Sequence, residues 1–461
     1  MSRKLYFSVD DESNDIIKRY EQYLTGTASG YFDVEELESI VDYYLRKGRT
    51  MDCSKAIEFG FKLHPNSTVL QCKRAKLYLL TGDDQKAFRI LSKLSESGDY
   101  EVNILKIEAF LKLDMIDEAR LLTRRLLEDE DEELDNMCLD LAFIYIGLDD
   151  NATALGLLQK GFEFNNKNIE LLHELAFCYE QADDYDNAID INNRIVAINP
   201  FADEAWFNLG QLYFAIQEFS KALNAFEFSL AIDENDSLAT VQKGHVQFQL
   251  NMFEEAIETY QDYRKMTSFT WQTDIFIGEC YERLELYDEA IFYYKRSYEV
   301  HPVNFDAISG IGICYLEQEM YSEAKVYIEL AIEIDANASD AWVYLAESYI
   351  GLENTEAALE AYLKSISIDM EQPDTFMAIA NIYLEKGDFN NAIVNYLIAN
   401  ELDGELEFIK MFIAIAYFRI GAIDEAISYL KQAIEEDEAA AEMFLELCPD
   451  SVEIIINKIT K

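Results

Sequence analysis

Small and apolar residues recur along this chain with a period of 34 residues. One alanine returns at that interval eight times in succession, which chance does not produce. Looser copies of the same position precede it, at steps of 35, 32 and 31 residues. A fixed period of this length is typical of a protein built from stacked structural repeats. The regular anchor alanines are Ala154, Ala188, Ala222, Ala256, Ala290, Ala324, Ala358, Ala392 and Ala426, and the looser copies are Ala119, Ala87 and Ala56.

Other positions keep a fixed distance from each anchor alanine. A second small residue stands twelve positions before it, a mostly aliphatic position thirteen before, and a tyrosine nine before in eight of the nine regular units. Short polar turns such as residues 182–184 interrupt the pattern. Each unit is therefore predicted to be two helices of about twelve to fifteen residues joined by a short turn. We expect the small residues to let the helices cross closely, with the tyrosine filling the gap beside them.

A hairpin of two helices cannot bury its apolar face alone, but the next hairpin can cover it. Half of the residues are hydrophobic, and only 18 Gly and 5 Pro are present, too few turn formers for an all-β protein. The pattern therefore predicts an all-α solenoid of about twelve helical hairpins.

The repeat resembles the tetratricopeptide repeat, whose pattern includes W-x2-L-G-x2-Y, then Ala, an aromatic residue, another Ala and Pro. The resemblance covers roughly residues 33 to 436. It implies a right-handed superhelix in which the first helix of each repeat lines a concave groove, and a role in protein interactions. Two units match best, one through Trp206, Leu209, Gly210, Tyr213, Ala222 and Phe226, the other through Trp342, Leu345, Ala346, Tyr349, Ala358 and Tyr362.

The pattern weakens toward both ends of the chain. Units before Ala154 are degenerate, with Ile107 at a small position and an acidic run over residues 128–133. We predict capping segments at both ends, because the exposed ends of a solenoid need them. The predicted parts are an N-terminal extension or cap over 1–32, degenerate repeats over 33–134, the regular array over 135–436 and capping helices over 437–461.

The chain is strongly acidic, with 88 Asp and Glu against 38 Lys and Arg and a formal net charge of -50. Such a surface repels nucleic acids and anionic membranes, because both are bound through Lys and Arg. It favours basic protein partners. Neither a signal-peptide pattern nor a stretch of ~18 uncharged apolar residues is found, so we expect a cytoplasmic protein without membrane insertion. Seven cysteines without a CxxC pair fit a reducing compartment.

No constellation of reactive residues stands out. Cys178, Cys280 and Cys314 share one phase of the repeat that is apolar in other units, so we expect buried packing residues. His173 and Glu174 begin a zinc-protease pattern, but its second His is missing. We therefore predict no enzymatic activity, no cofactor, no metal site and no small-molecule substrate.

One stripe of the predicted first helices is the candidate partner-binding surface. It joins the positions fifteen, eleven and eight before each anchor alanine, since steps of four and three stay on one helix face. None of its 27 members is Lys or Arg. The alternative is that its aromatic residues only pack against the next repeat. The candidate binding residues are Phe143, Phe177, Phe207, Gln211, Phe214, His245, Phe248, Glu279, Glu282, Glu347 and Asn381.

An aromatic and acidic groove suits an extended or helical segment that carries apolar anchors and Lys or Arg. A clamp for a C-terminal carboxylate is disfavoured, because Met377 stands beside Asn381 where a basic residue is wanted. We therefore predict a protein-binding scaffold, adaptor or assembly factor that captures a basic, amphipathic segment. Two alternatives stay open: a peptide sensor whose curvature changes on binding, and an enzyme or enzyme subunit.

Overall fold

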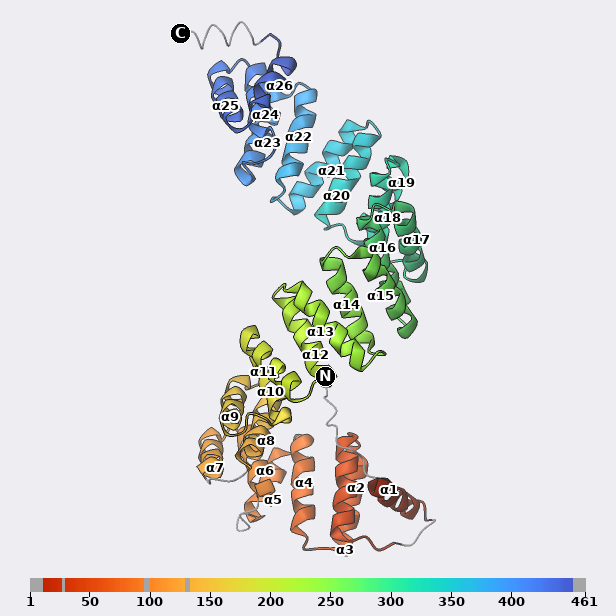
Figure 1. The fold of residues 1–461 in the computed structure, drawn as a ribbon, viewed down its shortest axis with the longest axis vertical. Coiled ribbons are helices and arrows are strands. Elements are labelled where there is room, and N and C mark those ends of the chain that lie inside the picture. Colours follow the sequence, from red (N-terminus) through yellow and green to blue (C-terminus); the bar gives the residue numbers. More distant parts are fainter. Residues whose placement is uncertain (1–10, 27–29, 95–99, 129–132, 451–461) are drawn as a thin grey trace. The chain divides into compact units, whose positions relative to one another are not determined.

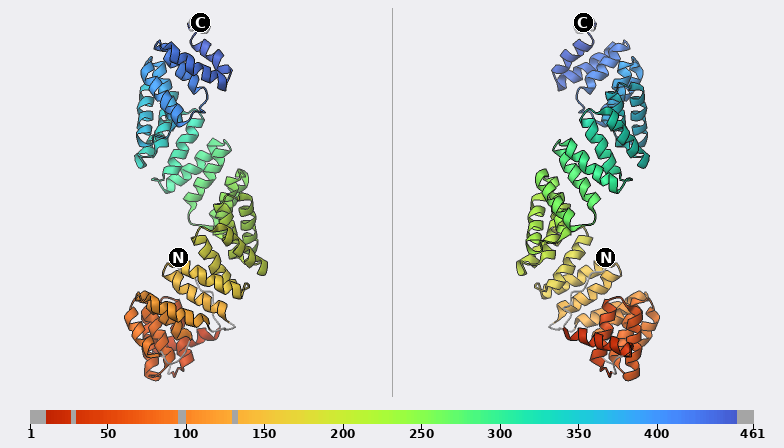
Figure 2. Two further views of the ribbon diagram at one scale, coloured as in Figure 1. Left: turned by 90° about the vertical axis from the view of Figure 1, so that its left-hand side faces the viewer. Right: turned by 90° about the vertical axis from the view of Figure 1, so that its right-hand side faces the viewer.

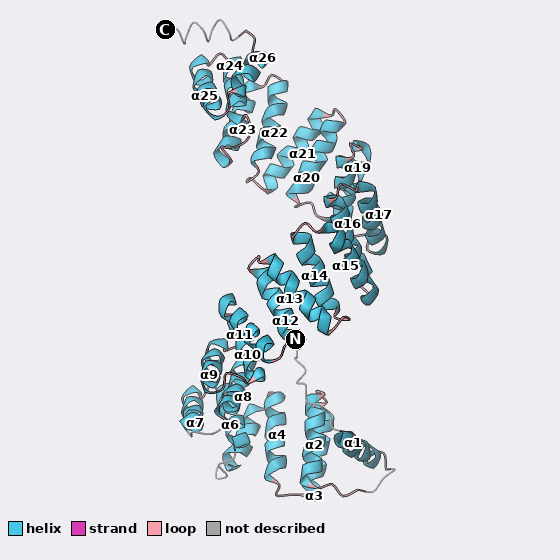
Figure 3. Ribbon diagram, viewed as in Figure 1, coloured by secondary structure: helices cyan, strands magenta, loops and turns pink. Residues whose placement is uncertain are grey.

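The computed structural model describes residues 11–26, 30–94, 100–128 and 133–450. In these ranges the regular elements are helices, and no strand occurs (Figure 3). The chain divides into two compact units, Met1–Leu212 and Tyr213–Lys461, and the division falls inside helix α12 (Asp203–Ala215). The predicted all-α solenoid is confirmed, because consecutive helices pack as hairpins within each unit.

The first unit begins with α1, and five helical hairpins follow it in chain order (Figure 1). Its helices are α1 (Asp11–Leu24), α2 (Val34–Arg46), α3 (Thr50–Leu63), α4 (Thr68–Leu80), α5 (Asp84–Leu91) with the 3-10 turn η1 (Ser92–Leu94), α6 (Tyr100–Lys112), α7 (Ile116–Glu128), α8 (Leu134–Gly147), α9 (Asn151–Phe164), α10 (Ile169–Gln181) and α11 (Tyr185–Ile198).

The second unit continues the same pattern from α13, and its hairpins can be followed in Figure 2. Its helices are α13 (Phe219–Ile232), α14 (Ser237–Gln249), α15 (Phe253–Met266), α16 (Thr270–Arg283), α17 (Tyr287–Val300), α18 (Phe305–Glu317), α19 (Tyr321–Ile334), α20 (Ser339–Gly351), α21 (Thr355–Ile368), α22 (Pro373–Glu385), α23 (Phe389–Leu402), α24 (Ile409–Arg419), α25 (Ile423–Glu436) and α26 (Ala439–Leu447).

Every regular anchor alanine is the fourth residue of a second helix and is almost completely buried. Five positions before it, the turn between the two helices contains one residue with a positive φ angle. That left-handed residue ends the first helix and reverses the chain within a few residues. The turn residues of the nine regular units are Asp149, Asp183, Gln217, Asn251, Glu285, Glu319, Glu353, Gly387 and Gly421.

In the first hairpin, the position of this turn shows that the anchor was assigned to the wrong residue. Gly48 has the positive φ angle there, and Cys53 stands five positions after it as the fourth residue of α3. Cys53 therefore takes the place that the sequence pattern gave to Ala56. Both side chains are fully buried. The small thiol packs where the other hairpins have alanine, so a search for alanine alone selected the wrong residue.

The tyrosine that fills the gap beside the small residues is also a different one from the tyrosine predicted. A Cβ added at Gly244 would lie 2.5 Å from the ring of Tyr260, and one at Gly278 would lie 2.7 Å from the ring of Tyr294. Each of these rings comes from the second helix, four positions after its anchor alanine. The tyrosine nine positions before the anchor alanine packs at another place. Tyr281, for example, stacks on Tyr293.

The ends of the solenoid are covered where the structure describes them. Helix α1 places Ile17 and Tyr20 in a core with residues of α2 and α3. Helix α26 places Ala440 and Phe444 against α24 and α25. The rest of the predicted C-terminal cap, residues 451–461, lies outside the described residues, as do residues 1–10 of the N-terminal extension.

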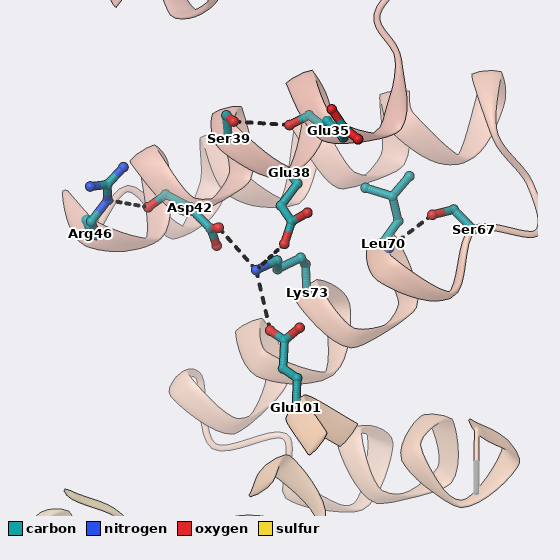
Figure 4. A network of polar contacts seen from close by, with 9 residues as sticks. All are labelled: Glu35, Glu38, Ser39, Asp42, Arg46, Ser67, Leu70, Lys73 and Glu101. Carbon is teal, nitrogen blue, oxygen red and sulfur yellow. Dashed lines mark hydrogen bonds and ion pairs between the residues drawn. The ribbon is translucent and has the colours of Figure 1, made fainter. Parts of the chain in front are cut away.

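A buried lysine joins three hairpins of the first unit. The Lys73 ammonium on α4 lies 2.9 Å from Glu38 and 3.1 Å from Asp42 on α2, and 3.4 Å from Glu101 on α6 (Figure 4). The Lys73 side chain is only 6% exposed. These three carboxylates raise its pKa against the opposing effect of burial. The ion-pair network therefore fixes the order and spacing of α2, α4 and α6.

Candidate functional site

The first helices of three successive hairpins in the second unit contact each other directly. Helix α16 touches α18, and α18 touches α20, in addition to the contacts within each hairpin. Among the described residues of this unit, the intervening second helices α17, α19 and α21 make no comparable contacts with one another. A stack that is closer on one side curves toward that side, so α16, α18 and α20 lie on its inner face.

Four carboxylates gather on this inner face, and we call them the acidic stripe. Glu279 and Glu282 come from α16, Glu317 from α18 and Glu347 from α20. Glu317 lies close enough to both Glu282 and Glu347 to repel their negative charges. In the described part of the chain, none of the four forms an ion pair with Lys or Arg. The acidic stripe therefore carries carboxylates on three neighbouring hairpins that no described Lys or Arg neutralises in an ion pair.

Partial burial makes it energetically unfavourable for carboxylates of the acidic stripe to be ionised. Burial, together with the nearby charges of Asp306 and Glu282, raises the pKa of Glu279 to about 7, although Arg283 opposes this shift. Burial also raises the pKa of Glu282, against a hydrogen bond and the Arg283 charge. A carboxylate surrounded by protein loses hydration that stabilises its ionised form. A cation placed here would restore that stabilisation.

Glu347 combines two properties that indicate a concave surface. Its side chain is exposed to solvent. Desolvation nevertheless raises its pKa, and Glu317 adds to the effect. A group on a convex surface would be both exposed and well hydrated. Glu347 is thus open to solvent on one side and surrounded by protein on the others.

Tyr294 positions one member of the acidic stripe. Its hydroxyl donates a 2.8 Å hydrogen bond to the Glu282 carboxylate. Its ring lies between two glycines, since a Cβ on Gly278 or on Gly310 would come within 2.7 Å of it. Gly278 belongs to α16 and Gly310 to α18. The ring therefore joins two hairpins and holds Glu282 at the inner face.

Two other predicted binding residues, His245 and Asn381, also have a tyrosine hydroxyl of the second helix as their partner. The Tyr260 hydroxyl lies 2.8 Å from Nδ1 of His245, and the Tyr396 hydroxyl donates to Asn381. The His245 ring also packs edge-to-face on Phe276, with centroids 4.8 Å apart. Burial lowers the pKa of His245, which favours the neutral imidazole. These polar side chains are held by their own hairpins.

The predicted aromatic residues are divided between the units. Phe214 packs on Phe219, and Phe248 packs on Phe253. In each pair the ring centroids are no more than 5.5 Å apart, and both rings lie near the turn of one hairpin. Both are half-buried, so they pack within their own repeat rather than only against the next one. The first unit contains the remaining predicted residues, of which Phe143 and Gln211 are exposed and Phe177 and Phe207 half-buried.

Sequence reasoning missed several members of this surface. Glu317 and Arg283 both stand seven positions before an anchor alanine, one position outside the predicted stripe. The Arg283 guanidinium lies 6.0 Å from the Phe248 ring and reduces the negative potential at Glu279. Tyr344, whose pKa is raised by burial and nearby carboxylates, stands fourteen positions before Ala358, on the same side of the stripe as Glu317 and Arg283. A wider face of each first helix would have included all three.

Comparison with protein families identifies the repeat. The tetratricopeptide repeat model matches residues 275–304, 306–337, 339–371, 373–405 and 409–439. The matched part of the chain, within residues 275–439, consists of tetratricopeptide repeats. Its acidic stripe lies within three matched repeats. A second family model, ChAPs (Chs5p-Arf1p-binding proteins), matches residues 102–231. No curated protein matches the chain.

Several solved structures are similar to this chain. The APC/C hetero-tetramer Cut9-Hcn1 has 14% identity, with 87% of this chain and 98% of that chain covered and a TM-score of 0.41. MamA has 23% identity, with 36% and 97% covered and a TM-score of 0.34. YrrB, described as a TPR protein with an unusual peptide-binding site, has 22% identity, with 41% and 96% covered and a TM-score of 0.34.

The histidines, cysteines and carboxylates of the described ranges do not gather into a metal site. In these ranges, no group of three or more His, Cys, Asp or Glu side chains is arranged to hold a metal ion. Cys178, Cys280 and Cys314 are buried in the core, as predicted, and burial raises the pKa of the Cys280 thiol to about 12. Among the described helices, none has the length and apolar character needed to cross a bilayer.

Proposed function

We propose that this protein is a scaffold that captures a basic, amphipathic segment of a partner protein on the acidic stripe. The observation that carries the proposal is the set of four carboxylates, drawn from three repeats and left without ion-pair partners in the described part of the chain. Retaining desolvated negative charge costs stability, and a bound Lys or Arg would offset that cost.

The family matches support a protein as the partner. The matched repeat is an interaction fold, and the family matched over residues 102–231 is named for binding two proteins, Chs5p and Arf1p. Apolar surface beside the carboxylates supports an amphipathic segment. Phe248, Phe276 and Tyr344 are half-buried on the first helices that carry or adjoin the acidic stripe. A helical or extended segment could place its cations on the stripe and its apolar side chains on these rings.

Neutralising the acidic stripe is expected to abolish most of this binding. The variant combines Glu279→Gln, Glu282→Gln and Glu347→Gln, and the probe is a fluorescein-labelled peptide of alternating lysine and leucine. We expect the dissociation constant to rise at least about tenfold, because truncating charge pairs in a desolvated site costs a few kcal/mol. Fluorescence anisotropy would measure the change.

A matched control removes the same charge from the second helices. Glu299, Glu323 and Glu333 are exposed on α17 and α19, so their replacement by glutamine keeps the net charge of the test variant. This control is expected to bind the peptide like the unchanged protein. Equal weakening in both variants would reject the acidic stripe as the site and indicate attraction by net charge alone.

Binding is also expected to depend on pH through Glu279. Its pKa of about 7 means that about nine-tenths of its carboxyl groups are protonated at pH 6, and about nine-tenths are ionised at pH 8. A cationic segment prefers the ionised form, so binding releases a proton and strengthens as pH rises. We expect affinity to increase up to about tenfold from pH 6 to pH 8. Glu279→Gln should flatten this profile, and an unchanged profile would exclude Glu279.

A further inference from the structure

A basic pocket interrupts the acidic surface of the first unit. It has a volume of about 330 Å³ and is lined by residues of α7, α8 and α9. Three of its charged residues are basic and one, Glu128, is acidic. Over the whole chain acidic residues outnumber basic ones 88 to 38, so this local reversal is unusual. The lining residues are Arg120, Thr123, Arg124, Leu127, Glu128, Tyr145, Thr153, Leu157 and Lys160.

The two arginines are arranged to act together. Arg120 and Arg124 stand four positions apart on α7, which places both guanidinium groups on one face of the helix. Both side chains are exposed. Neither forms an ion pair with a carboxylate of the described residues. A guanidinium group offers two parallel N–H donors, a geometry that matches a carboxylate.

The opposite wall of the pocket is fixed by a contact between the helices. Lys160 on α9 donates a 3.4 Å hydrogen bond from Nζ to the backbone carbonyl of Leu127 at the end of α7. Leu127 and Leu157 provide apolar surface, and the hydroxyl-bearing Thr123 and Thr153 line the same space. The pocket thus offers cations, hydroxyl groups and apolar contact together.

We propose that this pocket binds an acidic side chain of a second protein partner, with Arg120 and Arg124 pairing with its carboxylate. The proposal goes beyond the acidic stripe, because the site lies on another unit and selects the opposite charge. A protein segment is favoured over an anionic membrane, since a flat membrane would bring many negative charges against a chain of net charge -50. A single segment can place one carboxylate within the short range of the arginines.

The test uses a fluorescein-labelled decapeptide of alternating glutamate and leucine, with a glutamine and leucine peptide as its neutral counterpart. The full-length chain is expected to bind the acidic peptide and not the neutral one. Arg120→Gln with Arg124→Gln should weaken binding at least about tenfold, because each charge-assisted hydrogen bond contributes strongly. Lys160→Gln should weaken it less. Circular dichroism would verify that helicity is retained.

The control variant is Arg125→Gln with Lys167→Gln, which removes the same charge from exposed positions outside the pocket. It is expected to bind like the unchanged protein. Equal weakening in control and test variants would overturn the proposal. Failure of the acidic peptide to bind, together with arginine-dependent sedimentation on phosphatidylserine vesicles, would also overturn it in favour of a membrane.

A last experiment examines the chain's own acidic run, which continues in the sequence from the pocket residue Glu128. This variant replaces residues 129–132 by the corresponding amides. Similar binding before and after the replacement would support an external partner. Binding that occurs only after the replacement would overturn the proposal, because the occupant would then be the chain itself. None of these outcomes depends on the lysine peptide that tests the acidic stripe.

Discussion

Replacing Tyr294 by alanine is expected to lower the free energy of unfolding of the second unit by about 3–5 kcal/mol. The side chain is almost fully buried, and its ring fills the space between Gly278 and Gly310. Neither glycine has a side chain that could collapse into the cavity. The change also removes the hydrogen bond to Glu282, which leaves a desolvated carboxylate without its donor.

Hydrogen exchange of residues 270–317 would measure this loss better than a single melting temperature, because repeat arrays can unfold locally. Tyr294→Phe keeps the ring and should cost only about 1 kcal/mol, the typical value of one hydrogen bond. Phe292→Ala on the same helix is the control, since that ring is 57% exposed. Comparable protection in the Tyr294→Ala variant and the control would show that the ring does not join the two hairpins.

The period of 34 residues was enough to predict the helices, because each packing position repeats with the same kind of side chain. The turns were also predicted, at residues such as 182–184, but the left-handed residue within each turn was not. Asp183, Asn251 and Glu285 all adopt a positive φ angle that glycine adopts most easily. The hairpin fixes the backbone at this position while the side chain points to solvent. Its residue type varies, so the composition of the turn did not reveal it.

The candidate site was predictable only in part. Glu279, Glu282 and Glu347 were assigned to one stripe because helix geometry places them on one face within each repeat. The proximity of Glu317 to two of them depends on how neighbouring first helices are spaced. The role of Tyr294 depends on two glycines in different hairpins. A one-repeat pattern contains no information about such contacts between repeats.

Replacing Lys73 by methionine is expected to lower the free energy of unfolding of the first unit by about 2–3 kcal/mol. Breaking a buried ion pair costs about 3–5 kcal/mol when the remaining charge stays buried. Here the carboxylates of Glu38, Asp42 and Glu101 are 35%, 34% and 42% exposed, so hydration recovers part of that cost. Their mutual repulsion remains, because the ammonium that held them together is gone (Figure 4).

Urea unfolding followed by circular dichroism, with hydrogen exchange of residues 34–112, would measure this effect. Lys62→Met is the matched control, because Lys62 is exposed on the neighbouring helix α3. Adding Glu38→Gln and Asp42→Asn to Lys73→Met should restore much of the stability, since it removes the repulsion that the first change left. If the triple variant were less stable than Lys73→Met alone, the carboxylates would be stabilising these helices through contacts other than Lys73. The spacing of α2, α4 and α6 would then not depend on this network.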